Sequence, residues 1–588
     1  AMCVYVCVCV CVCARERERE RALSMEETPI RAAPAAKEVA EEEEEEIIFR
    51  SQLEPAPIPS NLSLPQFVLQ HVDDYADSIA IVDAVQATGK QFTHGQVRSL
   101  SFNVAAGLCK HFNIQKGDVV CVLLPNMAEY PILVFGILTA GGVFMGANTS
   151  SHPQELEKQI KHSEAKLVIT DIHSYEKIKQ PTNQLPIVVV NNENPPKGTI
   201  SASLLYDTDS SSVTLPQVSQ DDLCALPFSS GTTGISKGVM ITHRNLIANL
   251  CSTLFDLDKA KPGENVTLGL MPFFHIYGFT GICCSTLRTK GKVVVLARFE
   301  LGPFLEALIK HEVTFAPIVP PIILALVKSP LVEDYDLSKL KLQAVMSAAA
   351  PLAPDLQKSF EEKFPGVVIQ EAYGLTEHSC ITLSHCAPDH PRGIAKKGSV
   401  GFILPNLEVK FVDPQTGKSL PRNSLGEICV RSQCVTKGYY KNPSATNSTI
   451  DEQGWLHTGD VGYIDNDGDI FIVERIKELI KYKGFQVPPA ELEAILISHP
   501  EINDAAVVPV PHEEAGEIPA ACVVLAPGSF LTKEDVINFV ASKVASYKKV
   551  RLVDFVDSVP KTAAGKILRR NVKEDLLKRL QQKSSTTQ

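Results

Sequence analysis

The sequence lacks a long uninterrupted apolar run. No apolar span of about 18 residues occurs in the 588-residue chain, so we expect no transmembrane helix. Positive charge is not in excess either, because the formal net charge is −11 and no basic stripe offsets it. Proteins that bind nucleic acids usually carry a basic surface, so the sequence argues against nucleic acid as a partner. Part of the negative charge is local, since Glu41 to Glu46 form an unbroken acidic run.

Cysteine pairs spaced for a metal are also missing. The chain has 16 cysteines, but no CxxC pair or Cys/His cluster has the spacing of a zinc site. Adjacent Cys283 and Cys284 lie in an apolar stretch, where buried free thiols are expected, and free thiols fit a reducing compartment. The C-terminus at Gln588 is not a peroxisomal signal of the Ser-Lys-Leu type. We therefore expect a cytoplasmic protein and leave open its association with the endoplasmic reticulum surface or with a loose enzyme complex.

Residues 1–24 have a repetitive composition. Cys and Val alternate from Cys7 to Cys13, and Arg and Glu alternate from Arg15 to Arg21. The apolar repeat is too short for a bilayer and follows no basic region, so it predicts neither a transmembrane helix nor a signal peptide. Such pure alternation resembles translated dinucleotide-repeat DNA. We interpret residues 1–46 as a disordered or artefactual extension and expect natural translation to start at Met25.

Short β-branched runs alternate with helical segments between residues 60 and 440. The runs Asp118–Leu124 and Ala165–Thr170 are apolar on both faces, whereas Leu156–His162 has a helical period. This alternation predicts an α/β fold built from layers with parallel sheets. From Gly426 onward the predicted strands lie closer together, which indicates a β-rich, more antiparallel module. Its turn signals are Asn442-Pro443 and Asn466-Asp-Gly468.

The pattern changes again after Glu474. Pro488–Leu496 has proline near a helix start, and Thr532–Asp535 opens a second helix with a capping box. We therefore predict a large N-terminal domain over residues 47–474, a small α+β C-terminal domain over residues 475–577 and a tail over residues 578–588.

The segment Leu226–Val239 has the composition of a phosphate-binding loop. Gly231, Gly234 and Gly238 let backbone N–H groups converge on an anion, while five hydroxyl side chains and the cation of Lys237 add donors. It is not a Walker A loop, because the residue before the lysine is not Gly and the residue after it is not Ser or Thr. Alone, such a stretch is more often a surface linker, so the neighbouring motifs decide its interpretation.

Six further motifs lie beyond this loop in the chain. They are Thr242–Asn245, Met271–Gly278, Gln370–Glu377, Gly454–Asp460, Glu474–Gln486 and Pro560–Lys566. In their order and approximate spacing they resemble the adenylate-forming enzymes, the superfamily of acyl-CoA synthetases, 4-coumarate:CoA ligases, luciferases and peptide-synthetase adenylation domains. The resemblance runs from about residue 47 to about residue 577. It implies that a carboxylic acid is activated with ATP and Mg²⁺, and that a mobile C-terminal domain rotates about a hinge near Glu474–Arg475.

The resemblance assigns roles at the nucleotide site. The loop would hold the β- and γ-phosphates, Thr376 the α-phosphate and Glu377 the Mg²⁺, which prefers oxygen ligands. Asp460 would bind both ribose hydroxyls, Arg475 would add a contact to the ribose or phosphate, and Tyr373 would stack on adenine. The implied ATP and AMP contacts are Ser229, Ser230, Gly231, Thr232, Thr233, Gly234, Lys237, Ala372, Tyr373, Gly374, Thr376, Asp460, Arg475 and Lys566.

Two sets of residues in the C-terminal domain match the family. Lys566 would reach the carboxylate and the α-phosphate during adenylation, and rotation would bring Lys481 and Gln486 into place for thioester formation. Lys483 and Gly484 would then lie beside the pantetheine of coenzyme A. Only 22 residues (588 − 566) follow Lys566, too few for a fused carrier domain, so we expect free coenzyme A and leave open a separate carrier protein. The implied catalytic residues are Lys566, Lys481, Gln486, Thr376 and His275.

The expected acid is a fatty acid. The implied pocket departs from the pattern of the 4-coumarate ligases. This chain has Thr280 where those enzymes have Asn, Met346 where they have Lys, Ala348 and Ala372 where they have Gly, and Cys380-Ile381 where they have Pro-Val. Loss of an ammonium and an amide removes groups that favour a phenol, while Met and Ile offer apolar lining. Glu371–Thr382 is most similar to the plant fatty acyl-CoA synthetases of sporopollenin synthesis in the pollen wall, which implies medium- to long-chain acids, hydroxylated ones included. The pocket set is His275, Tyr277, Thr280, Met346, Ala348, Ala349, Ala372, Cys380 and Ile381.

Other functions remain open at this point. A hydroxycinnamate (4-coumarate):CoA ligase shares every motif and differs only in the acid pocket. A luciferase-like oxygenase shares the adenylation motifs. A non-catalytic acyl or nucleotide sensor is expected to have lost Glu377, Asp460 or Lys566, and all three are present.

Overall fold

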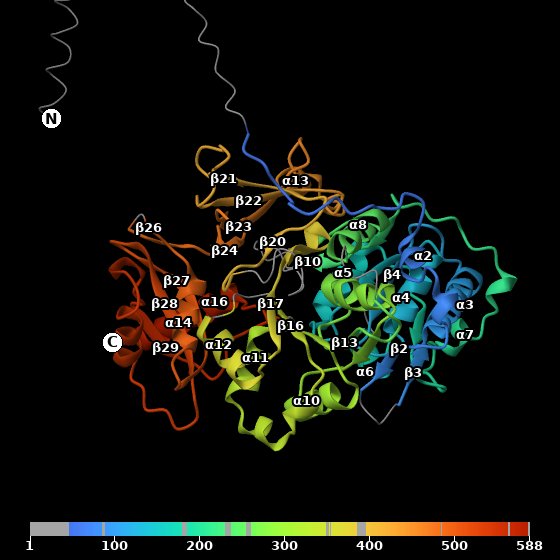
Figure 1. Ribbon diagram of the computed structural model, residues 1–588, viewed down its shortest axis with the longest axis horizontal. Coiled ribbons are helices and arrows are strands. Elements are labelled where there is room, and N and C mark those ends of the chain that lie inside the picture. Colours follow the sequence, from blue (N-terminus) through green and yellow to red (C-terminus); the bar gives the residue numbers. More distant parts are fainter. Residues whose placement is uncertain are drawn as a thin grey trace, which may run out of the picture. The chain divides into compact units, whose positions relative to one another are not determined.

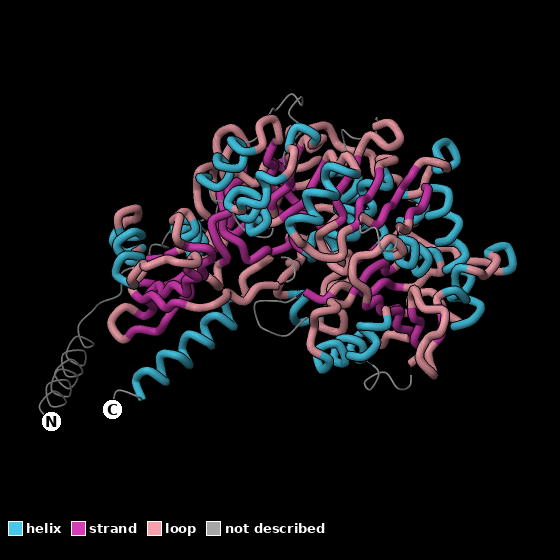
Figure 2. Tube along the Cα trace, turned by 90° about the horizontal axis from the view of Figure 1, so that it is seen from below, coloured by secondary structure: helices cyan, strands magenta, loops and turns pink. Residues whose placement is uncertain are grey.

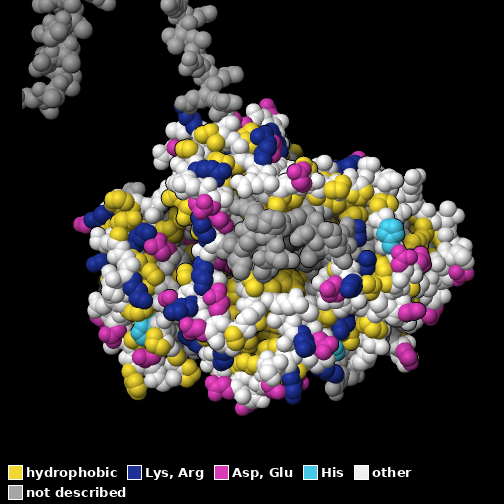
Figure 3. Space-filling model, in the orientation of Figure 1, with side chains coloured by type: hydrophobic (Ala, Val, Ile, Leu, Met, Phe, Trp, Pro, Cys, Tyr) yellow, Lys and Arg dark blue, Asp and Glu magenta, His cyan; other side chains and the backbone are white. Residues whose placement is uncertain are grey.

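The fold is known from a computed structural model, which describes residues 46–84, 89–178, 185–229, 237–254, 260–348, 352, 354–384, 396–483, 485–562 and 565–585. Residues Ile47–Gln588 form one unit of mixed α/β architecture, as the sequence predicts (Figure 1). None of the described helices is both long and apolar enough to cross a membrane. On the face drawn in Figure 3, Lys and Arg are interspersed with Asp and Glu.

The first large sheet is almost entirely parallel. Its strand order is β12-β9-β5-β4-β6-β7-β8, and only β12 is antiparallel to its neighbour. Strand β4 is buried throughout, because Val120 and Val122 join one apolar cluster while Val119 and Cys121 join another. The strands are β4 (Val119–Leu123), β5 (Val143–Gly146), β6 (Leu167–Thr170), β7 (Ile187–Val189), β8 (Ile200–Ser201), β9 (Leu223–Ala225) and β12 (Ile241–Thr242).

The second large sheet carries the candidate site at its carboxyl edge. Its order is β17-β16-β15-β13-β14-β2-β3, and only β3 is antiparallel. In open α/β sheets, ligands bind beyond the carboxyl ends of the strands, so the segments after β15, β16 and β17 are where a site is expected. The strands are β2 (Ile79–Asp83), β3 (Gln91–Thr93), β13 (Val266–Gly269), β14 (Lys292–Val295), β15 (Phe315–Ile318), β16 (Ala344–Ser347) and β17 (Val368–Glu371).

Helices lie against these sheets (Figure 2). Local signals explain several of their ends: Thr93 caps α3 and Thr242 caps α8, each in a capping box with the residue three positions later. The helices are α2 (Leu64–Val68), α3 (His94–Phe112), α4 (Tyr130–Thr139), α5 (Pro153–Ser163), α6 (Ile172–Ile178), α7 (Ser203–Tyr206), α8 (His243–Thr253), α9 (Ser285–Arg288), α10 (Leu301–Lys310), α11 (Pro320–Lys328) and α12 (Pro354–Lys363), with a π-helix at Tyr277–Cys284.

The predicted antiparallel module is confirmed. Strands β1 (Phe49–Arg50), β21 (Glu408–Val412), β22 (Gly426–Arg431), β23 (Leu456–Ile464) and β24 (Ile470–Arg475) form it in that order. Two short sheets adjoin the site, namely the hairpin of β10 (Phe228–Ser229) with β11 (Lys237–Gly238), and β18 (Tyr373–Leu375) with β19 (Cys380–Ser384) and β20 (Phe402–Ile403).

One of the two predicted turns in this module is wrong. Asn466-Asp-Gly468 does connect β23 and β24, but Asn442-Pro443 begins helix α13 (Pro443–Asn447). The Asn442 side chain accepts the Ala445 N–H at 3.0 Å, so asparagine acts here as an N-cap and proline occupies the first helical turn.

The C-terminal sheet comes after β24 in the chain. Its order is β26-β25-β28-β27, with β29 paired to β28. Both predicted helices are present as α14 and α15, and α16 packs Val572 and Leu576 on this sheet. The domain boundary at 474/475 stays a prediction. The elements are β25 (Ile480–Tyr482), β26 (Phe485–Val487), α14 (Pro489–Ile497), β27 (Ile502–His512), β28 (Gly516–Leu525), α15 (Lys533–Ala541), β29 (Leu552–Phe555) and α16 (Arg569–Ser585).

Candidate active site

A buried carboxylate, Asp460, lies at the centre of the candidate site. It stands opposite Arg475 in the β23–β24 ladder, and the Arg475 Nε donates to its Oδ1 at 3.1 Å. The Tyr373 hydroxyl donates to its Oδ2 at 2.5 Å. Burial raises the pKa of Asp460, and the charge of Arg475 opposes that effect. Both carboxylate oxygens are therefore held in place by donors from separate strands, while stacking of Tyr373 on adenine stays a prediction.

Lys566 lies close to this carboxylate. A tight turn sets its position, because the Gly565 N–H donates to the Thr562 carbonyl at 2.8 Å and Gly565 adopts a φ of 81°. A Cβ on that glycine would lie 3.2 Å from Val319, so the turn packs closely on the wall of the acid pocket. The surrounding protein lowers the pKa of Lys566 to about 8, with Arg475 also lowering it and Glu478 and Asp460 raising it.

An apolar cavity of about 120 Å³ opens beyond the carboxyl ends of β15 and β16. The Tyr277 hydroxyl donates to the Met346 sulfur at 3.3 Å across it. Thr280 does not line the cavity; it is buried in the π-helix, and its hydroxyl has no partner among the described residues. The lining residues are Met271, Pro272, His275, Ile276, Tyr277, Gly278, Ile318, Val319, Met346, Ala348, Ala372, Tyr373, Gly374 and Leu375.

His275 lines the cavity, and the charge of Lys566 acts on it. His275 is exposed, and surrounding protein atoms and the charge of Lys566 lower its pKa to about 4. Its Nδ1 accepts the Tyr277 N–H at 3.2 Å, so the neutral ring carries its proton on Nε2. His275 can therefore donate from Nε2 at neutral pH without adding charge.

Asn126, which the sequence analysis missed, fixes the segment leading to His275. Its Nδ2 donates toward the carbonyls of Gly269, Leu270 and Met271 at 3.0 to 3.1 Å, and its Oδ1 accepts the Phe273 N–H at 2.8 Å. The side chain is 7% exposed. A polar residue three positions after the end of the apolar strand β4 is the sequence signal that indicates such a role.

Glu377 lies beside the first strand of the phosphate-loop hairpin. The hydroxyls of Ser229 and Tyr439 donate to its Oε1 at 3.0 and 2.9 Å. Lys237 lies over the Tyr439 ring, with Nζ 4.6 Å from the centroid. Tyr439 was also missed, because no nearby motif marks it. Carboxylate and hydroxyl oxygens are ligands that Mg²⁺ prefers. Both hydroxyls donate to the Oε1 of Glu377, so its Oε2 could bind the ion, and this set of residues fits Mg²⁺.

Several predicted residues lie outside the described part of the chain. Thr376, adjacent to Glu377, is described and begins a 3₁₀ helix, Thr376–His378. The residues outside the described ranges are Ser230, Gly231, Thr232, Thr233, Gly234, Ala349 and Gly484, together with the side chains of Cys380 and Ile381.

The residues predicted for thioester formation are not at Asp460. Lys481 and Gln486 pair across the β25–β26 hairpin and are exposed, and Lys483 is exposed in the turn between these strands. Strand β26 is an edge strand of the C-terminal sheet, on which Phe485 stacks with Tyr547 at 4.6 Å. The structure therefore brings Lys566, and not Lys481 or Gln486, to the candidate site.

Arg569 fixes the segment that connects the two predicted domains. Its guanidinium contacts Glu478 and Glu493 at 2.6 Å each and Glu474 at 3.8 Å. Arg569 is 14% exposed, so these are buried ion pairs. Lys328 of α11 adds a direct bond to the Ile502 carbonyl at 3.2 Å.

Comparison with known proteins identifies the family of this chain. The family model of AMP-binding enzymes matches residues 68–440, and that of the AMP-binding enzyme C-terminal domain matches residues 491–566. The chain is 59% identical to 4-coumarate–CoA ligase-like 1 of Arabidopsis thaliana, over 92% of this chain and 99% of that protein. It is 42% identical to 4-coumarate–CoA ligase 1 of Petroselinum crispum, over 90% of this chain and 97% of that protein.

Solved structures give the same answer. ATP-bound MatB from Rhodopseudomonas palustris is 28% identical with a TM-score of 0.78, covering 88% of this chain and 99% of that one. The anthranilate CoA ligase AuaEII in complex with anthranoyl-AMP is 26% identical with a TM-score of 0.78, covering 88% and 98%. The chain therefore belongs to the AMP-binding enzyme family, as an adenylate-forming, AMP-releasing CoA ligase with 4-coumarate–CoA ligase-like relatives.

Proposed function

We propose that this ligase activates medium- to long-chain fatty acids, hydroxylated ones included, and that it serves sporopollenin formation. A carboxylate oxygen would attack the α-phosphorus of ATP, forming the acyl-adenylate as the bond to pyrophosphate breaks. The coenzyme A thiolate would then attack the acyl carbon and release AMP. The observation that carries the proposal is an apolar cavity whose described lining residues, Met346, Ile318 and Val319 among them, carry no charge, with His275 in its wall.

The first half-reaction needs positive charge where two anions meet. Lys566 would supply it between the acid carboxylate and the α-phosphate, and Asp460 would hold the ribose. Mg²⁺ bound by Glu377 would screen the charge of the phosphates. The His275 Nε2–H would orient the acid carboxylate without adding charge, because its pKa is lowered.

The second half-reaction needs a different arrangement of the C-terminal domain. Lys566 is at the site while Lys481 and Gln486 are exposed, so we propose that the observed arrangement serves adenylation. Rotation beyond Arg475 would withdraw Lys566 and present the β25–β26 hairpin to coenzyme A. Lys483, in the turn of that hairpin, would then contact the coenzyme.

Met346 supports the choice of acid. Its thioether lies at the Tyr277 hydroxyl, so no charged group meets a substrate there. A cavity of about 120 Å³ is smaller than the roughly 300–1,000 Å³ of typical ligand pockets. We propose that it holds the carboxyl end of the acid and that the rest of a long chain extends past Ala348.

A hydroxycinnamate:CoA ligase is the second candidate. The small volume of the cavity favours a short, flat acid. The name of the 42% identical relative, 4-coumarate–CoA ligase 1 of Petroselinum crispum, also favours such an acid.

Substrate kinetics separate the two candidates. The full chain would be assayed for pyrophosphate release and for CoA thioesters with fatty acids from octanoate to octadecanoate, their ω-hydroxylated forms and 4-coumarate. We expect a higher kcat/KM for fatty or hydroxy-fatty acids, and a rate about 100- to 1,000-fold lower in Lys566→Ala. A higher kcat/KM for 4-coumarate would replace the proposed substrate with the second candidate.

A further inference from the structure

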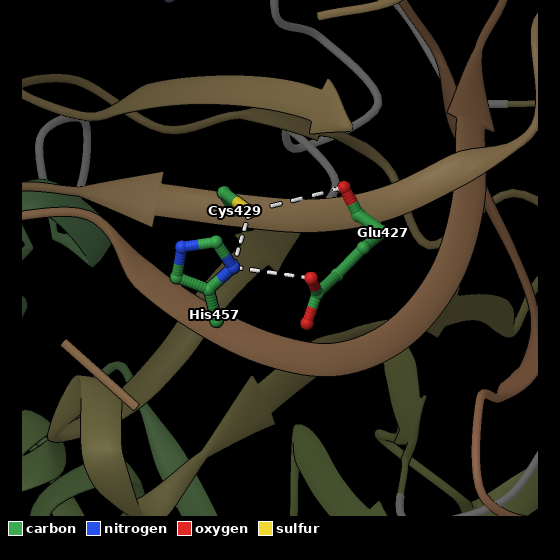
Figure 4. Close-up of side chains that lie close together, drawn as sticks. All are labelled: Glu427, Cys429 and His457. Carbon is green, nitrogen blue, oxygen red and sulfur yellow. Dashed lines mark hydrogen bonds and ion pairs between the residues drawn. The ribbon is translucent and has the colours of Figure 1, made fainter. Parts of the chain in front are cut away.

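Three side chains with metal-binding atoms meet on the antiparallel sheet, outside the nucleotide site. Cys429 of β22 is the ladder partner of His457 of β23, and Glu427 lies two residues before Cys429, so its side chain falls on the same face (Figure 4). One ligand atom from each of the three residues lies within 4.8 Å of the other two.

Two of the three distances between the ligand atoms are close to the edges of a tetrahedral zinc site, and the third is within 4.8 Å. The Cys429 Sγ lies 3.4 Å from the His457 Nδ1, and the Glu427 Oε2 lies 3.1 Å from the same nitrogen. Zinc–ligand bonds of about 2.3 Å to sulfur and about 2.0 Å to nitrogen and oxygen give tetrahedral edges of about 3.6 and 3.3 Å. The His457 Nδ1–H can donate to the Glu427 Oε2, and the Cys429 Sγ lies 4.0 Å from the Glu427 carbonyl oxygen, so a shared ion would take the place of these contacts.

The surroundings also fit a metal. The other ring nitrogen, His457 Nε2, lies 3.5 Å from the Asp451 Oδ2, which is the carboxylate–histidine arrangement that orients metal-binding imidazoles. Cys429 is fully buried, whereas the His457 side chain is 33% exposed. An ion could therefore enter from solvent past His457 and keep a water as its fourth ligand.

We propose that Glu427, Cys429 and His457 form a binding site for a borderline-soft divalent cation, with Zn²⁺ as the fitting ion. Thiolate and imidazole ligands select such ions over Mg²⁺, so this site is chemically distinct from Glu377. Binding would release to solvent both the Cys429 thiol proton and the proton held on the His457 Nδ1. The Glu427 Oε1 accepts the Gly459 N–H at 3.0 Å, and Gly459 directly precedes Asp460. One oxygen of Glu427 would thus bind the ion while the other holds the backbone beside Asp460. The inference does not depend on the proposed substrate.

Cobalt is the probe, because Co²⁺ bound to a thiolate gives a charge-transfer band in the near ultraviolet. The protein is the full chain with serine at Cys3, Cys7, Cys9, Cys11 and Cys13, which removes the thiols of the N-terminal repeat. It is titrated with Co²⁺ without nucleotide and with excess Mg²⁺. We expect a band that saturates at one ion per chain, accompanied by proton release, and that Zn²⁺ removes.

Variants locate the band. Cys429→Ser abolishes it, whereas Cys522→Ser, which changes another buried cysteine, leaves it intact. Asp451→Asn keeps the Oδ1 bonds to Gln453 and Trp455 and changes the atom facing His457, so it should weaken Co²⁺ binding about 10- to 100-fold without loss of fold. Absence of the band in the folded parent, or an equal band in Cys429→Ser, overturns the site and leaves His457 as an ion-pair bridge between Glu427 and Asp451. If Cys429→Ser fails to fold, an unchanged Co²⁺ affinity in Asp451→Asn overturns the site instead.

Discussion

Tyr373 holds Asp460 through a hydrogen bond of 2.5 Å between its hydroxyl and the Oδ2 atom. Tyr373 lies in strand β18 and Asp460 in strand β23, which belong to different sheets. The carboxylate is therefore positioned by packing between the sheets as well as by the pairing of β23 with β24. If Asp460 accepts the ribose hydroxyls, as we propose, this bond sets the orientation of the carboxylate before nucleotide arrives.

Removing this hydroxyl should weaken nucleotide binding. A hydrogen bond to a charged group contributes about 1.5–3 kcal/mol, so Tyr373→Phe should raise the KM for ATP about tenfold or more. Tyr463→Phe makes the same chemical change in β23, where the ring stacks on Phe471, and should leave the KM for ATP unchanged. Equal KM values for the two variants would show that the bond does not position Asp460.

The charge of Lys566 should appear in the pH profile. Its pKa is lowered to about 8, so the side chain is charged below that pH and neutral above it. If the charge serves adenylation, kcat/KM for pyrophosphate release, which reports the free enzyme, should fall as pH rises through about 8.

Lys566→Arg should move that decline to higher pH, because guanidinium stays charged, and Lys566→Ala should remove it and lower the rate about 100- to 1,000-fold. Lys561, which bonds Asp504 at 2.8 Å, offers the control Lys561→Arg. A decline that persists unshifted in Lys566→Arg would assign it to another group.

Arg569 and Arg570 allow a matched test of the buried ion pairs. Arg569→Ala leaves Glu493 and Glu474 buried without their main cation, which should cost about 3–5 kcal/mol of unfolding free energy. Among the described residues, Arg570 forms an ion pair only with exposed Glu574 one turn away, so Arg570→Ala should change little. Denaturant unfolding of both variants measures the difference, and similar midpoints would contradict it.

The sequence predicted those parts of the fold that local signals determine. Strand β4 is predicted by its apolar run, and α15 by the capping box at Thr532. Asn442-Pro443 was misread because the same pair can open a turn or cap a helix, and the choice depends on the residues after the proline.

Contacts between distant segments could not be predicted in the same way. Cys429 and His457 are far apart in sequence, and only the register of β22 and β23 makes them neighbours. Tyr439 reaches Glu377 through a loop that carries no motif. The resemblance to known enzymes named Asp460 and Lys566, but their common location with His275 depends on the arrangement of the C-terminal domain.

Asn126 gives a prediction about the segment that carries His275. Asn126→Asp retains an acceptor for the Phe273 N–H but turns an anionic oxygen toward three carbonyls, which should cost about 2 kcal/mol or more. Burial raises the pKa of the introduced carboxyl group above its unfolded value, so the folded variant binds a proton more readily, and the loss should shrink as pH falls. Thermal unfolding between neutral pH and about pH 5 measures this.

Asn406→Asp is the control for that substitution, because its Nδ2 donates to one carbonyl, that of Ala56. It should lose less stability. A loss in Asn126→Asp that does not change with pH would mean that the three carbonyls do not determine the effect.

Substitution of Met346 tests which of the two candidate acids the cavity selects. Met346→Lys places an ammonium at the Tyr277 hydroxyl, inside an apolar cavity, where a fatty chain cannot pair with it but a phenolic hydroxyl can. We expect kcat/KM for fatty acids to fall at least about tenfold and the ratio of 4-coumarate to fatty acid activity to rise. Met346→Leu keeps the volume and the apolar character, so it should preserve the fatty acid preference. If Met346→Lys lowers activity on all acids by the same factor, the side chain supports the wall of the cavity without selecting the substrate.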